Sequence, residues 1–333
     1  MIKAIALLSG GLDSILAAKL ILEQGIDVEA VNFLTVFCTC TARGKTCLAS
    51  KSAADKLGIK LRVFEVSKEY FEIIKNPKYG YGSNMNPCLD CRIFMFKKAG
   101  QYMKEQGASF LVTGEVLGER PMSQRKEAMR IIERDSGLEG LILRPLSAKL
   151  FSPTIPEKKG IVNRERLLAI QGRSRKPQIE LAKCLDINDY PCPAGGCLLT
   201  DAGFTRRMHD LMKHKPDFTV EDVRLLKEGR HFRLSKEAKL IVGRNEQENE
   251  RLLHLAAEND IYFYPLSILG PVGIGRGEFS EECFSKAASI IARYSDGKKD
   301  IPLEIAYRRI PSSKASLILT LPVLEGELER ARI

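Results

Sequence analysis

The feature that most constrains the fold lies in the first fifteen residues, where a short apolar run leads into two adjacent glycines. Residues 2–8 are mostly apolar and are followed by Ser-Gly-Gly-Leu-Asp-Ser at positions 9–14. A strand, a glycine turn and a helix can hold phosphate, because glycine lets backbone N–H groups approach an oxyanion and the helix adds its positive N-terminal end. We therefore predict a phosphate-binding loop here, with an ordinary strand–turn–helix as the alternative.

Each residue type in this loop suits that chemistry. Ser9 and Ser14 can donate hydroxyl hydrogen bonds to phosphate, and Gly10 and Gly11 allow a close backbone approach. Asp13 can hold Mg²⁺ against the phosphates. The loop is not a Walker A motif, since no Gly-Lys-Ser/Thr follows.

The first 145 residues alternate between strand-like and helix-like patterns, which predicts βαβ units and a parallel sheet. The predicted strands cover residues 2–8, 28–36, 59–66, 109–113 and 140–144, and the predicted helices 13–24, 45–57, 87–106 and 121–134. Ligands bind beyond the carboxyl ends of such strands. The glycine loop, residues 37–40 and Thr113-Gly114-Glu115 all follow strands, so we expect one shared pocket, with Gly114 and Glu115 in the nucleotide site.

The remaining chain divides by composition into two further segments. Residues 146–215 form a basic connector, punctuated by prolines, that includes a loop ending in Gly195-Gly196-Cys197. Residues 216–333 are predicted to form a smaller α+β domain, with strands at 239–243, 261–264, 268–274 and 303–307 and helices at 245–259 and 280–294. The predicted fold class is therefore α/β: a parallel-sheet nucleotide-binding domain over residues 1–145, then the connector, then the α+β domain.

Positive charge is concentrated in the connector. The chain has a net charge of +10, and nine basic residues stand against two acidic ones between Arg144 and Lys176. Such a segment predicts a polyanionic partner, usually a nucleic acid, although a solvated loop is the alternative. The candidate RNA-binding residues are Lys158, Lys159, Arg164, Arg166, Arg173, Arg175 and Lys176.

No apolar stretch approaches the roughly 20 residues that span a bilayer. The N-terminal apolar run stops at Ser9, and Asp13 interrupts what would be a signal sequence. We therefore expect a cytoplasmic protein with no membrane partner. In that compartment nine cysteines are not a disulfide framework, so metal ligation or sulfur chemistry is the better prediction.

A Cys-x-x-Cys motif opens the predicted helix at residues 87–106. Cys88 and Cys91 would lie near the positive end of that helix with Arg92 adjacent, conditions that favour thiolate. The motif alone is shared by zinc sites, redox pairs and iron–sulfur clusters. Cys197, which follows two glycines, is a third candidate thiol.

The other cysteines carry less information. Cys38, Cys40 and Cys47 could join a zinc site with Cys88 and Cys91, relay sulfur or have no chemical role, and Cys192 is equally open. Cys184 and Cys283 lie at helical positions with apolar neighbours, so we expect both in the core.

Three motifs together resemble a known family. The loop at 9–14, the Asn-Pro-Cys-x-x-Cys segment at 86–91 and Thr-Gly-Glu-Val-Leu-Gly at 113–118 follow the order found in PP-loop tRNA thiolation enzymes. Residues 1–200 resemble the ATPase domains of 4-thiouridine synthetases and, more distantly, the tRNA 2-thiouridylases. The resemblance implies a HUP-like fold and an ATP pyrophosphatase that adenylates a uridine carbonyl oxygen, after which sulfur displaces AMP.

The family's site residues map onto this chain by position. Ser9, Gly10, Gly11, Asp13 and Ser14 would bind ATP and Mg²⁺. The resemblance makes Cys88, Cys91 and Cys197, with Asp13, the candidate catalytic residues: in cluster-dependent members the three cysteines hold a [4Fe–4S] cluster, and in persulfide-dependent relatives such thiols transfer sulfur. The expected partners are tRNA or another RNA and a sulfur donor, either sulfide or a sulfurtransferase, and a homodimer is an assembly to test.

The chain also departs from the synthetases. After Gly118 it reads Glu-Arg-Pro-Met-Ser-Gln instead of their usual continuation. Segments at 226–232, 242–249 and 287–295 are similar to the RNA-binding domain of the NFACT ribosome-associated family. Two alternatives therefore stay open: a PP-loop ATPase for amidation or deazapurine chemistry with a structural zinc, and an RNA-binding protein without catalysis.

Overall fold

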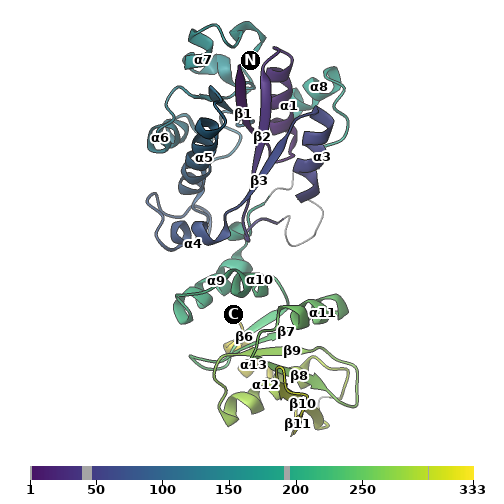
Figure 1. The fold of residues 1–333 in the computed structure, drawn as a ribbon. Helices are drawn as coiled ribbons and strands as arrows, with labels where there is room; N and C mark the ends of the chain where they lie inside the picture. Colours follow the sequence, from purple (N-terminus) through teal and green to yellow (C-terminus); the bar gives the residue numbers. More distant parts are fainter. Residues whose placement is uncertain (1, 40–46, 191–195, 299) are drawn as a thin grey trace. The chain divides into compact units, whose positions relative to one another are not determined.

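Two separate sheets organise the chain, one in each of two units that comprise residues 1–200 and 201–333 (Figure 1). The computed structural model describes residues 2–39, 47–190, 196–298 and 300–333. Cys40, Cys192 and the side chain of Cys47 lie outside this description. The three-part division at residues 145 and 215 stays a prediction.

The sheet of the first unit has five parallel strands in the order β3-β2-β1-β4-β5. The strands are β1 (Lys3–Leu7), β2 (Asp27–Leu34), β3 (Leu61–Glu65), β4 (Phe110–Thr113) and β5 (Ile142–Leu143). The winding reverses between β1 and β4, and ligands bind at such switch points of open sheets. The predicted parallel α/β architecture is therefore confirmed.

Helices cover both faces of this sheet, with α1, α3 and α8 on one face and α5 and α6 on the other (Figure 1). Both faces are consequently apolar, and every residue of β4 is buried. The helices are α1 (Leu12–Leu22), α3 (Cys47–Leu57), α4 (Ser67–Lys75), α5 (Cys88–Glu105), α6 (Lys126–Ser136), α7 (Ile155–Lys158) and α8 (Lys176–Cys184). No helix of the described chain has the length and apolar character that crossing a membrane requires.

One helix starts later than the sequence pattern predicts. The helix predicted at 121–134 is α6 and begins at Lys126, because the preceding residues form a turn held by two hydrogen bonds. The Gly118 N–H donates to the Gln124 carbonyl oxygen at 2.7 Å, and the Arg120 N–H donates to Gln124 Oε1 at 2.9 Å. This turn keeps residues 118–120 next to the end of β4.

The second unit has a six-stranded antiparallel sheet in the order β11-β10-β8-β9-β7-β6. Its strands are β6 (Arg230–Arg233), β7 (Lys239–Val242), β8 (Ile261–Pro265), β9 (Gly273–Arg276), β10 (Leu303–Arg309) and β11 (Ser316–Thr320). Its helices are α9 (Ala202–His214), α10 (Val220–Leu225), α11 (Glu246–Leu255), α12 (Glu281–Arg293) and α13 (Glu325–Ala331). The expected second α+β domain is therefore confirmed.

Both edge strands of this sheet escaped prediction. β6 carries charged residues at both ends, and the strand β11 exposes Leu317 and Leu319, so neither has the expected alternation of buried and polar positions. The strand predicted at 268–274 is β9, which starts only at Gly273. Pairing across the sheet, not local sequence, defines these strands.

A buried lysine in β7 leads to a pH-dependent stability. Burial lowers the pKa of Lys239 to about 8, although Asp210, 3.3 Å away, opposes this. Between pH 8 and the usual pKa of a lysine, 10.5, the Lys239 amine holds its proton more in the unfolded state than in the folded state. The free energy of unfolding should therefore rise as the pH rises through this range. In Lys239→Met this contribution should vanish, which urea denaturation at pH 8 and pH 10 will measure. A rise of equal size in both proteins would contradict the prediction.

Candidate active site

The glycine loop between β1 and α1 closes on itself through its two serines. The Gly11 N–H donates to the Ser9 hydroxyl at 3.3 Å. The Ser14 hydroxyl lies 3.2 Å from that of Ser9 and donates to the Gly11 carbonyl oxygen at 2.8 Å. Asp13 lies in the first turn of α1. The loop therefore has the strand–turn–helix geometry predicted from its sequence.

Two glycines let the backbone around this loop pack closely. A Cβ on Gly10 would lie 2.6 Å from the carbonyl carbon of Ala49, and the φ angle of Gly10 is +81°. A Cβ on Gly114, which follows β4, would lie 2.4 Å from the carbonyl carbon of Asp13. Both positions consequently require glycine, and Gly114 fixes the first turn of α1 against the end of β4.

The Asp13 carboxylate lies in a half-buried group of charged side chains. Arg175, which precedes α8, places Nη2 3.8 Å from Asp13 Oδ2. Burial raises the pKa of Asp13, although Arg175 and Arg120 lower it. Burial also raises the pKa of Glu119, and the charge of Asp13 adds to that rise. Two carboxylates and two guanidinium groups thus share this end of the sheet.

The three predicted thiols come from two distant segments of the first unit and converge. Cys88 and Cys91 occupy the first turn of α5. Cys197 forms an isolated β-bridge with Cys38, and the Leu198 N–H donates to the Phe37 carbonyl oxygen at 2.9 Å. The charges of Cys38, Cys88 and Cys91 all raise the pKa of Cys197, which requires their proximity. The structure therefore adds Cys38 to the predicted three thiols.

These thiols lie in a dry environment. Burial is the main cause that raises the pKa of Cys88 and of Cys91, and it raises the pKa of Cys197 to about 12. The Arg92 guanidinium opposes the rise at Cys88 and Cys91. The buried Tyr70 hydroxyl hydrogen-bonds to Cys91. The expectation that the helix end and Arg92 favour the thiolate of Cys88 and Cys91 is therefore wrong for the thiols without a metal, because burial outweighs both effects.

Two arginines connect the thiols with the glycine loop. Arg120 lowers the pKa of both Asp13 and Cys88, so its guanidinium lies within electrostatic range of both groups. Arg92 Nε lies 3.4 Å from Glu115 Oε1, next to the glycine that packs on Asp13. Glu115 is 1% exposed and also pairs with the buried Arg144 at 3.2 Å. The glycine loop and the thiols thus both lie within electrostatic range of Arg120.

The predicted RNA-binding residues divide into two groups. Arg164 is engaged within the protein, since it pairs with Glu157 and donates to the Ala148 and Phe151 carbonyl oxygens. Arg175 lies at Asp13, as described above. The exposed group consists of Lys158, Lys159, Arg166, Arg173 and Lys176.

Three residues of the site had no signal that singled them out in the sequence. Tyr70 is a buried aromatic residue of α4, Arg120 follows Glu119 in the loop after β4, and Gln178 is completely buried in the first turn of α8. Of the two cysteines expected in the core, Cys283 is buried and Cys184 is exposed.

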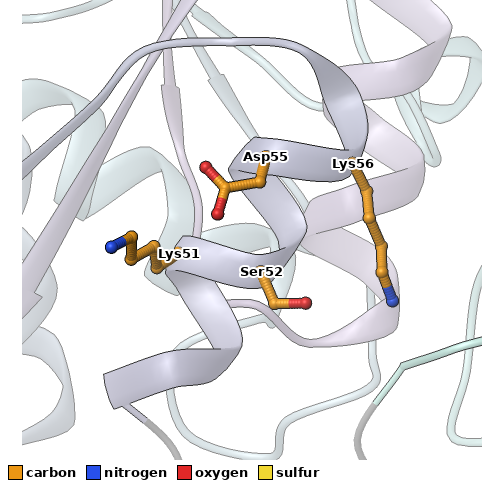
Figure 2. Close-up of a pocket in the computed structure, with 4 residues that line it drawn as sticks. All are labelled: Lys51, Ser52, Asp55 and Lys56. Atoms are coloured by element: carbon orange, nitrogen blue, oxygen red, sulfur yellow. The ribbon is translucent and has the colours of Figure 1, made fainter.

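The described part of the chain contains no group of three or more His, Cys, Asp or Glu side chains arranged to hold a single metal ion. A hollow of about 540 Å³ lies on α3 and is lined by Lys51, Ser52, Asp55 and Lys56 (Figure 2). It contains none of the predicted site residues, and Lys56 pairs with Asp189. We therefore assign the hollow no part in the site.

Comparison with known proteins gives two family matches. Residues 2–163 match the family model of the thiamine biosynthesis protein ThiI, and residues 229–331 match that of the NFACT protein RNA binding domain. The tRNA-specific 2-thiouridylase MnmA of Petrotoga mobilis is 32% identical over 34% of this chain and 35% of its own length. A probable tRNA sulfurtransferase of Methanosarcina mazei is 30% identical over 35% of this chain and 29% of its own.

The chain thus spans less than two thirds of the length of these curated relatives. A solved structure, a 4-thiouridine synthetase–RNA complex with bound ATP, aligns with a TM-score of 0.39 and 20% identity, covering 68% of this chain and 52% of that one. The resemblance inferred from the motifs is confirmed: the chain joins a segment similar to the PP-loop tRNA thiolation enzymes to a C-terminal segment similar to the NFACT RNA-binding domain.

Proposed function

We propose that this chain is an ATP-dependent enzyme that inserts sulfur into RNA, with a tRNA uridine as substrate. The observation that carries the proposal is the electrostatic link of Arg120 to both Asp13 and Cys88, which joins a phosphate loop and a set of thiols. The ThiI match over residues 2–163 and relatives named for tRNA thiolation support it.

The loop supplies the ATP half of the reaction. The Gly10 and Gly11 backbone and the positive end of α1 would bind the phosphates, and Asp13 would hold Mg²⁺. The uridine carbonyl oxygen attacks the α-phosphorus of ATP, and pyrophosphate leaves. The oxygen then departs with AMP when sulfur attacks the same carbon, because an adenylate leaves far more readily than a carbonyl oxygen.

The thiols supply the sulfur half. Soft thiolates are the ligands of iron–sulfur clusters, and Cys88, Cys91 and Cys197 lie within electrostatic range of one another, so the donor set fits a [4Fe–4S] cluster. With three thiolate ligands the cluster would offer one iron for binding sulfide. Arg92 and Arg120 favour the thiolate of Cys88, and Tyr70 orients Cys91 by hydrogen bonding.

The charge distribution favours RNA contact through the first unit. Basic residues exceed acidic ones by nine in residues 1–200 and by one in residues 201–333. The exposed lysines and arginines of residues 158–176 would neutralise phosphates, and the NFACT match adds a second RNA contact. We propose the reducing cytoplasm as the compartment, because no disulfide joins the cysteines that the structure describes.

Reconstitution under anaerobic conditions tests this function. Purified chain, Mg-ATP, sulfide and tRNA from a strain that lacks the gene should give a thiolated uridine by nucleoside mass spectrometry, with equimolar AMP and pyrophosphate. Asp13→Ala should abolish the thiolated uridine and the release of AMP and pyrophosphate, since it removes the carboxylate at the phosphates. If the deletion strain keeps all of its thiolated tRNA nucleosides, the substrate assignment is wrong.

Metal analysis of the same preparation discriminates the alternatives. Iron with acid-labile sulfide and a broad visible absorption band supports the cluster. Zinc without iron would instead favour the PP-loop chemistries of amidation or deazapurine synthesis, in which cysteines hold a structural ion.

A further inference from the structure

A second carboxylate lies beside Asp13. Leu117 forms a β-bridge with Gln171, and the Gly172 N–H donates to the Leu117 carbonyl oxygen at 2.7 Å. This pairing holds the turn that carries Glu119 against the segment that ends in Arg175, whose guanidinium approaches Asp13. Glu119 accordingly lies within electrostatic range of Asp13, Arg120 and Arg175.

Four buried polar atoms around these carboxylates have no hydrogen-bond partner among the described residues. Asp13 Oδ1, Arg175 Nε and both polar atoms of the Gln178 side chain are buried without a hydrogen bond. Gln178 is 0% exposed, and its amide is close enough to lower the pKa of Asp13 without reaching ordinary hydrogen-bond geometry. Burying an unsatisfied amide costs about 1–3 kcal/mol. These groups are therefore suited to a polar ligand that contacts Asp13.

We propose that Asp13 and Glu119 together bind the divalent cation that accompanies ATP, and that Gln178 positions the Asp13 carboxylate for it. Without the cation, Arg175 provides the positive charge nearest to Asp13 Oδ2, at 3.8 Å. The inference deepens the proposed function and rests on one part of it, the binding of ATP at the glycine loop.

The chemistry of magnesium fits this arrangement. Mg²⁺ is bound in proteins through one or two carboxylates, with substrate phosphates and water as its other ligands. Two protein carboxylates are consequently enough, and a site with three protein ligands is not required. A cation between Asp13 and Glu119 also removes their mutual repulsion, which contributes to the raised pKa of Glu119.

Glu119 is the second carboxylate of the proposed cation site. It follows Gly118 in the turn after β4 and is only partly exposed. Among the residues that the structure describes, no ion pair within 4 Å engages the Glu119 carboxylate. The carboxylate is thus available to a cation.

Titration of Mn²⁺ into the full-length chain with ATP tests the cation site, by electron paramagnetic resonance of free Mn²⁺ and by calorimetry. Glu119→Gln should weaken Mn²⁺ binding at least about tenfold and leave ATP binding without divalent cations unchanged or tighter. Its melting temperature without metal should not fall, since the change removes a repulsion. Glu139→Gln, an exposed carboxylate elsewhere in this unit, is the matched control and should bind Mn²⁺ like the original chain. Equal Mn²⁺ affinity in Glu119→Gln and the control would overturn the proposal.

Gln178→Leu separates positioning from structure. If Gln178 orients Asp13, this variant should lose Mn²⁺ affinity about tenfold while its melting temperature stays or rises, because an unsatisfied buried amide is replaced by an apolar side chain. A lower melting temperature with unchanged Mn²⁺ affinity would assign Gln178 a structural role and refute this part. Neither titration needs RNA or a sulfur donor, so a failure of the thiolation assay would leave these outcomes unaffected.

Discussion

Replacing Cys197 with serine is expected to abolish sulfur insertion into RNA while ATP binding stays intact. Cys197 is held beside Cys38 by a backbone bridge, and its thiol is buried among the other thiols of the site. A serine hydroxyl neither carries sulfur nor ligates iron well, so we expect a loss of roughly a thousandfold or more in thiolation rate. The backbone bridge and the glycine loop do not depend on the thiol.

The measurement combines thiolated nucleoside by mass spectrometry with ATP affinity by calorimetry. Cys184→Ser is the matched control, because Cys184 is exposed on α8 and is not among the thiols whose charges act on Cys197. The control should keep the original rate. Sulfur insertion by Cys197→Ser at more than a tenth of that rate would mean that the Cys197 thiol is not required for sulfur transfer.

Replacing Gly114 with alanine is expected to destabilise the first unit and prevent ATP binding. The added Cβ would lie 2.4 Å from the Asp13 carbonyl carbon and 2.5 Å from the Ser14 nitrogen. Both are backbone atoms, so the first turn of α1 has to move and the loop loses its geometry. Overpacking of this kind costs about 1–3 kcal/mol in the free energy of unfolding, and displaced N–H groups no longer meet the phosphates.

Urea denaturation and calorimetry with ATP measure the two effects separately. Gly326→Ala is the control, since no atom lies within 4 Å of its added Cβ and its φ angle is not positive. Gly326 lies in the first turn of α13, where alanine is neutral or stabilising by up to about 1 kcal/mol. Gly114→Ala with unchanged ATP affinity would contradict the role given to this close contact.

Of the four converging cysteines, the sequence identifies some and leaves others without a role. Cys88 and Cys91 were identifiable because both thiols lie three residues apart at the start of one helix. Cys38 was one of several cysteines without a role, since nothing local distinguishes it from Cys40 or Cys47. Its proximity to Cys197 arises from a single bridge between segments about 160 residues apart, which no local pattern encodes.

The position of Arg175 could not be predicted from its sequence segment. Its position in a basic segment predicts a contact with RNA, yet it lies 3.8 Å from Asp13 because α8 packs beside α1. Charge composition reports that a segment is basic, and only packing decides which of its guanidinium groups point to solvent. Gln178, whose burial is complete, had no compositional signal.

The sequence by itself determined the glycine loop between strand and helix, the parallel sheet and the thiol pair, because each depends on contacts within one turn or on strict periodicity. Tertiary structure alone decided that Glu119, Arg175 and Gln178 surround Asp13, and that Cys38 and Cys197 lie together. Those arrangements depend on strand order and helix packing, where residues distant in sequence meet and burial sets the strength of their charges.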